Sequence, residues 1–209
     1  MMKKSCERLA ERVRRERGFS TVELAVVVLI LLVVAGMVIP SMMQTWYDLE
    51  LRATGSEVSD LMQRARIMAA KNNATYPIGY TVSNGVQQAF IDLNANGAWD
   101  AGEPIVELAR RINAASGAPN GSNGAPTPYV LAGDTTSGTP YNNSNLLAFN
   151  SRGLPCNYIG TTTPVTCSTP ASTYFVYYFQ DNRPNGWCAV VVTKAGRSKA
   201  LVWSGSSWQ

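Results

Sequence analysis

The chain has 209 residues, of which 45% are hydrophobic and only 15% are charged, so it can build one core-forming domain and an appendage. It contains no histidine, which excludes Ser-His-Asp triads, histidine metal sites and histidine pH sensing. The net charge of +4 comes from residues 1–18, which hold seven Lys or Arg and three Glu. From residue 19 onward the chain carries eleven charges of each sign. The net charge of this part is therefore zero and does not favour binding to nucleic acid.

An uncharged apolar run follows the basic stretch. It covers residues 24–39 and ends at Pro40. A helix over residues 19–39 rises about 1.5 Å per residue, which matches the roughly 30 Å hydrocarbon core of a bilayer. The basic flank stays cytoplasmic by the positive-inside rule, which places the chain after Pro40 outside the cytoplasm. A cleaved Sec signal peptide is disfavoured, because residues 37–41 offer no small-x-small site.

Glu23 argues against a plain membrane anchor. A carboxylate near the start of a membrane segment costs up to a few kcal/mol in lipid, so it calls for a neutralising partner. The nearest candidate is a free amine at Phe19.

The sequence RGFSTVEL at residues 17–24 resembles the class III signal of type IV prepilins. The resemblance implies that a prepilin peptidase cuts between Gly18 and Phe19 on the cytoplasmic face, and that the new Phe19 amine is N-methylated. It also implies that Glu23 pairs with the N-terminal amine of a neighbouring subunit during assembly. Two opposite charges that neutralise each other in lipid would fix the register between subunits.

This resemblance implies the partners and the location of the protein. The partners are other pilins or pseudopilins in a filament, the prepilin peptidase and an inner-membrane assembly platform. We expect a single-pass protein of the inner membrane, with a cytoplasmic N-terminus and its head outside the cytoplasm, that then enters a pilus or a periplasmic pseudopilus.

The helical pattern continues beyond Pro40 to about residue 73. Apolar residues recur at positions 42, 46, 49, 53, 58, 61, 65 and 68 and predict one apolar face, and Pro40 and Gly55 are predicted bend points. The rest predicts strands at residues 76–82, 86–91, 105–112, 146–150, 173–179, 187–193 and 199–203. The predicted fold is α+β, a long N-terminal helix packed on an antiparallel sheet, as in pilins.

The predicted organisation has four parts. Residues 1–18 form the prepilin leader, residues 19–40 the membrane-spanning or filament-core helix, residues 41–73 its amphipathic half, and residues 74–209 a β-rich head. Residues 113–145 of the head are rich in Gly, Ala, Pro, Ser, Thr and Asn and predict a surface insertion.

Four stretches of the head and helix resemble the GspH/FimT class of minor pilins and pseudopilins. They are residues 65–73, residues 90–104, residues 149–155 and residues 195–199. The resemblance implies a minor type IV pilin that primes or caps a filament, or a minor pseudopilin of type II secretion.

The loop from Asp92 to Glu103 has the calcium spacing of an EF-hand. The set Asp92, Asn94, Asn96, Asp100 and Glu103, with Gly97 at the turn, satisfies D-x-[DN]-x-[DN]-G-x₅-E. An EF-hand loop lies between helices, whereas the flanks here predict strands, and Asn, Asp and Gly also suit a wide hairpin turn. The structural turn is therefore the favoured interpretation, with Ca²⁺ as the alternative and no other cofactor expected.

Three cysteines stay in the mature chain after Cys6 leaves with the leader. Cys156, Cys167 and Cys188 allow one disulfide and one leftover thiol, and the sequence does not choose the pairing.

The turn at residues 194–199 is a candidate DNA contact. Some minor pilins of this family take up DNA through a C-terminal Gly-Arg-x-Arg motif, and here Gly196 precedes Arg197 and Lys199, with Lys194 nearby. Trp203 and Trp208 could stack on bases if exposed. Three cations on a neutral chain favour a hairpin turn with solvated charges over a DNA site.

The sequence holds no phosphate loop, G-x-S-x-G, H-E-x-x-H or dinucleotide motif. We therefore predict that the protein is not an enzyme.

Overall fold

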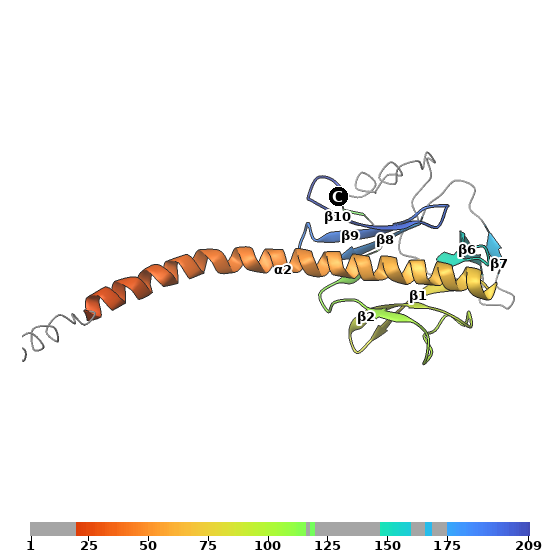
Figure 1. Ribbon diagram of the computed structural model, residues 1–209, viewed down its shortest axis with the longest axis horizontal. Helices are drawn as coiled ribbons and strands as arrows, with labels where there is room; N and C mark the ends of the chain where they lie inside the picture. Colours follow the sequence, from red (N-terminus) through yellow and green to blue (C-terminus); the bar gives the residue numbers. More distant parts are fainter. Residues whose placement is uncertain (1–19, 116–117, 120–146, 160–165, 169–174) are drawn as a thin grey trace, which may run out of the picture. The chain divides into compact units, whose positions relative to one another are not determined.

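The computed structural model describes residues 20–115, 118–119, 147–159, 166–168 and 175–209 (Figure 1). The described chain forms two compact units, one up to Thr45 and the other from Trp46 to Gln209. Helix α2 (Thr21–Asn72) runs through both. The strands are β1 (Tyr76–Ser83), β2 (Val86–Ile91), β3 (Ile105–Glu107), β4 (Asn113–Ala115), β5 (Leu147–Phe149), β6 (Pro155–Ile159), β7 (Thr166–Ser168), β8 (Phe175–Gln180), β9 (Trp187–Val192) and β10 (Ser198–Val202).

Helix α2 begins and ends close to the predicted positions. The Ser20 side chain accepts a hydrogen bond from the Val22 N–H at 3.4 Å, as an N-cap serine does. At the other end Asn73 has a left-handed φ of 50°, and the Ala74 N–H bonds back to the Ala69 carbonyl. Within the described residues α2 is the one helix long and apolar enough to cross a membrane, and its apolar part is not buried.

The strands form two antiparallel sheets, which confirms the α+β fold class. One sheet has the order β3-β2-β1-β5-β6-β7 and the other the order β10-β9-β8-β4. In Figure 1 the second half of α2 lies alongside strands of both sheets. The shared core contains helix residues such as Leu51, Val58 and Met62 together with Ile78 of β1 and Val190 of β9. Both sheets are therefore held on one helix.

The apolar face of α2 is not the continuous stripe that the spacing predicts. Val58 and Leu61 are buried, but Trp46 and Leu49 are exposed. The step from position 53 to position 58 is five residues, which turns the side-chain direction by about 140° on a helix of 3.6 residues per turn. Residues 51, 54, 55 and 58 form the buried face instead.

Gly55 allows close packing between helix α2 and the second sheet. Helix α2 continues through this position, and Gly55 is buried. A Cβ there would collide with the Cys188 sulfur of β9 and lie 3.2 Å from the Ala200 Cβ of β10. The absent side chain lets the helix approach the sheet.

The strand predictions need three corrections. The predicted strand at residues 105–112 ends at Glu107, and Leu108 and Ile112 are buried core residues of the following loop. Strand β4, which pairs with β8, occupies the start of the predicted insertion, whose residues 116–117 and 120–145 lie outside the described part. Strands β6 and β7 were missed, because both are short and β6 begins with proline.

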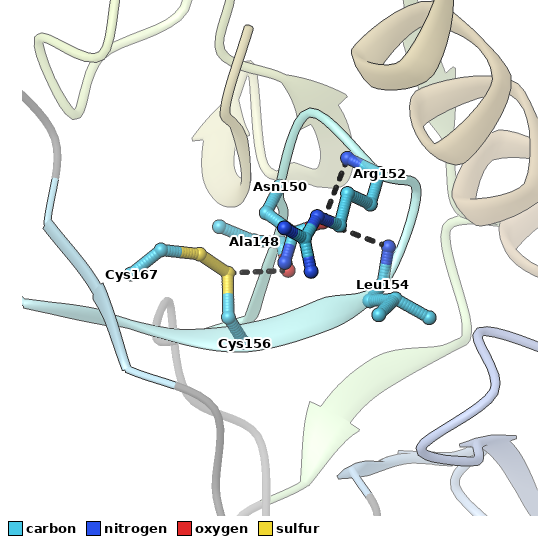
Figure 2. Close-up of a disulfide and its surroundings, with 6 residues drawn as sticks. All are labelled: Ala148, Asn150, Arg152, Leu154, Cys156 and Cys167. Carbon is cyan, nitrogen blue, oxygen red and sulfur yellow. Dashed lines mark hydrogen bonds between the residues drawn. A yellow bond between two sulfur atoms is a disulfide. The ribbon is translucent and has the colours of Figure 1, made fainter. Parts of the chain in front are cut away.

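A disulfide joins β6 to β7 (Figure 2). It links Cys156 to Cys167 with their Cα atoms 5.5 Å apart, which resolves the open pairing. The Cys156 sulfur lies 3.3 Å from the Ala148 carbonyl oxygen of the neighbouring β5. Cys188 is a buried thiol in the other sheet.

Burial of Cys188 predicts a loss of stability at high pH. Desolvation raises the pKa of this thiol from 9.0 to about 12, against a smaller lowering by a hydrogen bond with the Leu201 backbone. The unfolded chain therefore releases the thiol proton first, so stability falls as the pH rises from 9 toward 12. Burial also raises the pKa values of Tyr80 and Tyr177, so the effect of these two phenols on stability at high pH has the same sign as that of the thiol.

The Cys188→Ala variant isolates the thiol, because both tyrosines stay in place. We expect its melting temperature to fall less steeply than that of the wild type above pH 9. Equal slopes for the two proteins would contradict the assignment.

Candidate functional sites

The predicted processing segment is described only from Ser20 onward, so Gly18 and Phe19 lie outside the described residues. Glu23 lies in the first turn of α2 and is exposed. No described residue forms a hydrogen bond or an ion pair with its carboxylate.

The loop from Asp92 to Glu103 connects β2 to β3 and is built around two buried carboxylates. Asp92 is 2% exposed, and it accepts hydrogen bonds from the N–H groups of Asn96 at 3.2 Å and Gly97 at 2.7 Å. Glu103 is 8% exposed, and it accepts from the N–H groups of Leu93 at 2.7 Å and Asp100 at 3.0 Å. Each carboxylate thus takes the place of the backbone carbonyls that would accept from these N–H groups in a helix or a sheet.

The other predicted calcium ligands also bond within the loop. The side-chain amides of Asn94 and Asn96 donate to Asp100 at 2.7 and 2.6 Å. Ala95 and Gly97 adopt left-handed backbone angles, and the Tyr158 hydroxyl donates to the Ala95 carbonyl at 3.3 Å. In the described part of the chain no three His, Cys, Asp or Glu side chains are grouped as metal ligands. The flanks are strands, as the turn interpretation requires.

The turn interpretation predicts no calcium-specific stabilisation. If the loop bound Ca²⁺ with a Kd of about 1 mM, then 10 mM Ca²⁺ would stabilise the fold by about 1.4 kcal/mol. We expect the melting temperature in 10 mM CaCl₂ to equal that in MgCl₂ of the same concentration. A rise with Ca²⁺ alone that Glu103→Gln abolishes would establish the site and contradict the turn interpretation.

Arg66 of α2 connects two turns that belong to different sheets. Its Nε donates to the Gly153 carbonyl and its Nη1 to the Gly196 carbonyl, both at 3.2 Å. Gly153 lies in the turn between β5 and β6, and Gly196 lies in the turn between β9 and β10. Both glycines have left-handed φ angles, of 71° and 75°. We call these contacts the Arg66 lock.

Hydrogen bonds on the preceding turn of α2 extend the lock. The Gln63 amide donates to the Ser198 hydroxyl at 2.7 Å. The hydroxyls of Ser59 and Ser198 lie 2.8 Å apart, and Ser198 also donates to the Ser59 carbonyl. These contacts bring together three of the stretches quoted above, residues 65–73, 149–155 and 195–199. The structure therefore gives those stretches a shared packing role.

Loss of the Arg66 lock is expected to destabilise the fold. Arg66→Ala removes two charge-assisted hydrogen bonds, which costs about 3 kcal/mol. It leaves the Gly153 carbonyl without its side-chain donor and the Gly196 carbonyl with only the 3.5 Å bond from the Gln63 amide. Arg64→Ala is the matched control, because Arg64 is exposed on the same helix. Urea unfolding of the full chain in detergent measures both. Equal unfolding free energies for the two variants would refute the lock.

The C-terminal basic turn carries the predicted DNA residues on a compact scaffold. The Thr193 hydroxyl accepts from the Arg197 N–H at 3.3 Å, and the Gly196 N–H donates to the Thr193 carbonyl. Arg197 and Lys199 are exposed and Lys194 is half-buried. This geometry suits a solvated hairpin turn and leaves two cations open to an anion.

Of the two tryptophans that the DNA hypothesis considered, Trp203 is buried and Trp208 is half-buried. Trp203 is only 9% exposed. Its ring centroid lies 5.3 Å from that of Trp208, which in turn lies 5.9 Å from that of Tyr178. Trp203 is therefore not available to stack on bases, whereas Trp208 is half-buried and packs against Trp203 and Tyr178.

An ionic and aromatic cluster near the first turns of the head was not predicted. Arg183 pairs with Asp48 of α2 at 2.9 Å and with Asp181 at 2.6 Å. Burial lowers its pKa, but hydrogen bonds and charges of the two aspartates outweigh this, so the pKa rises overall. The guanidinium carbons of Arg111 and Arg183 lie 3.7 and 5.3 Å from the Tyr47 ring centroid. The cluster holds the β8–β9 turn on the helix.

Comparison with protein-family models, with curated proteins and with solved structures found no match for the chain. The functional conclusions therefore depend on the residues and their geometry.

Proposed function

We propose that the protein is a minor type IV pilin of the GspH/FimT kind, anchored in the inner membrane until it enters a filament. The observation that carries the proposal is Glu23, a carboxylate without a partner in the described chain. It lies in the first turn of a helix that begins just after a stretch resembling the prepilin cleavage signal. A filament supplies the missing amine from the next subunit. In this proposal the carboxylate and the amine pair only on assembly. The ion pair then offsets the free-energy cost of a carboxylate in an apolar environment and favours entry into the filament.

The architecture supports the same function. The apolar first part of α2 is exposed over its length, and its second part carries two antiparallel sheets. An exposed apolar helix is stable only in lipid or against other apolar helices. In this proposal lipid covers it before assembly and neighbouring subunits cover it afterwards, while the Arg66 lock and the core hold the head on the other half.

The test is recovery of the protein in sheared filaments. The wild-type chain is expressed with a prepilin peptidase and a pilus assembly system, and the sheared fraction is compared with the membrane fraction by immunoblot. We expect the wild type in both fractions and the uncleavable Gly18→Arg variant in the membrane only. A wild-type protein confined to the membrane would contradict the proposal.

A further inference from the structure

The head unit exposes an apolar surface on the outer side of α2. Trp46 is 68% and Leu49 58% exposed, and Trp46 is the most exposed of the five tryptophans. A groove of about 520 Å³ lies here, lined by Trp46, Tyr47, Leu49, Glu50, Ala53 and Arg111. The core of the unit does not use this face, because its buried helix residues point the other way.

The sequence position of this surface determines what can cover it. Trp46 follows Ile39, the last residue of the apolar run, by seven residues of the same helix. Seven helical residues rise at most about 10 Å. The headgroup region extends about 5–8 Å beyond each side of the hydrocarbon core. Helical side chains lean toward the N-terminus of their helix, here toward the apolar run, which brings the Trp46 ring within reach of the headgroups. Met42 and Met43, in between, are exposed apolar residues as well.

The residue types at this surface are those that favour the membrane interface. Tryptophan and tyrosine collect at headgroup level, because each joins an apolar ring to a polar group. Arg111 stacks on the Tyr47 ring at 3.7 Å, which orients the guanidinium at the edge of the groove. A planar guanidinium is a good partner for a phosphate oxygen pair. Apolar anchors beside an oriented cation match a phospholipid surface.

We propose that Trp46, Leu49 and Arg111 form a lipid-docking surface that rests the head on the headgroup layer of the bilayer that the same chain crosses. Trp46 and Leu49 enter the boundary between headgroups and acyl chains, and Arg111 contacts lipid phosphates. The surface fixes the height of the head above the membrane before assembly. This inference requires only the membrane span and does not depend on the proposed filament function.

Quenching of tryptophan fluorescence by brominated lipids tests the proposal. The full chain is reconstituted in phosphatidylcholine and phosphatidylglycerol vesicles whose acyl chains carry bromine at shallow or deep positions. Residues 19–39 contain no tryptophan, so the signal reports on the head side. We expect shallow bromines to quench the wild type more than deep ones, and Trp46→Phe to lose most of this quenching. The matched control Trp99→Phe, at a partly exposed loop tryptophan, keeps it.

A second variant keeps the reporter and changes the surface. Leu49→Asp places a charge beside Trp46 and is expected to reduce the quenching and shift the emission to longer wavelength. Equal quenching in the wild type and Trp46→Phe would overturn the proposal. A second result would also overturn it: Trp46 is not quenched by the lipids, and its emission shifts to shorter wavelength as the protein-to-lipid ratio rises. In that case a second copy of the chain would cover the surface. Neither peptidase nor assembly system is present, so such failures would leave the filament proposal intact.

Discussion

Glu23→Gln is expected to leave cleavage after Gly18 intact and to remove the protein almost completely from filaments. The amide keeps the size of the side chain but cannot neutralise the amine of a neighbouring subunit. Leaving one member of a buried ion pair without its partner costs about 3–5 kcal/mol. That energy corresponds to a reduction in incorporation of about a hundredfold or more.

The measurement is the ratio of the variant in sheared filaments to that in membranes, with its cleavage checked by mass. Glu57→Gln is the matched control, since Glu57 is an exposed carboxylate on the same helix outside the apolar run. We expect the control variant to assemble like the wild type. Normal incorporation of Glu23→Gln would show that the carboxylate has no role in assembly.

Gly55→Ala is expected to lower the free energy of unfolding although alanine favours helices. The gain in helix propensity is about 1 kcal/mol. The new methyl group collides with the Cys188 sulfur, and overpacking of this kind costs about 1–3 kcal/mol, plus displacement of the helix from β9. The collision and the displacement of the helix together outweigh the gain in propensity, and we expect a net loss of up to about 2 kcal/mol.

A double-mutant cycle identifies the collision as the cause. Cys188→Ala removes the sulfur, so the Gly55→Ala change should cost less in that background than in the wild type. Gly36→Ala is the control in the same helix, because no atom lies within 4 Å of its added methyl group. Additive effects at positions 55 and 188 would exclude the proposed contact.

The elements with strong local patterns could be predicted from the sequence. Helix α2 has a long apolar run, a serine cap and a left-handed Asn73 at its end, and it was predicted within about two residues. Strands β1 and β2 are joined by Asn84 and Gly85, both with positive φ, which is a strong hairpin signal. The loop from Asp92 to Glu103 has a similarly local pattern, since its side chains bond its own backbone.

The elements that depend on distant partners could not be predicted. Strand β4 has the sequence Asn-Ala-Ala, which has little strand preference, and it forms by pairing with β8 some sixty-five residues later. Arg66 binds turns that follow it by 87 and 130 residues. Arg183 joins Asp48 across a similar separation. Spacing along the chain carries no information on such contacts. The exposure of Trp46 has a different cause, because the five-residue step from position 53 to position 58 breaks the predicted apolar face.

The most direct test of the central claim is the intact mass and N-terminal sequence of the membrane-extracted protein, expressed with and without a matching prepilin peptidase. We expect a peptidase-dependent loss of residues 1–18 and a methylated Phe19 at the new N-terminus. An unchanged Met1 start in the presence of active peptidase, or a cut beyond Ile39, would contradict it.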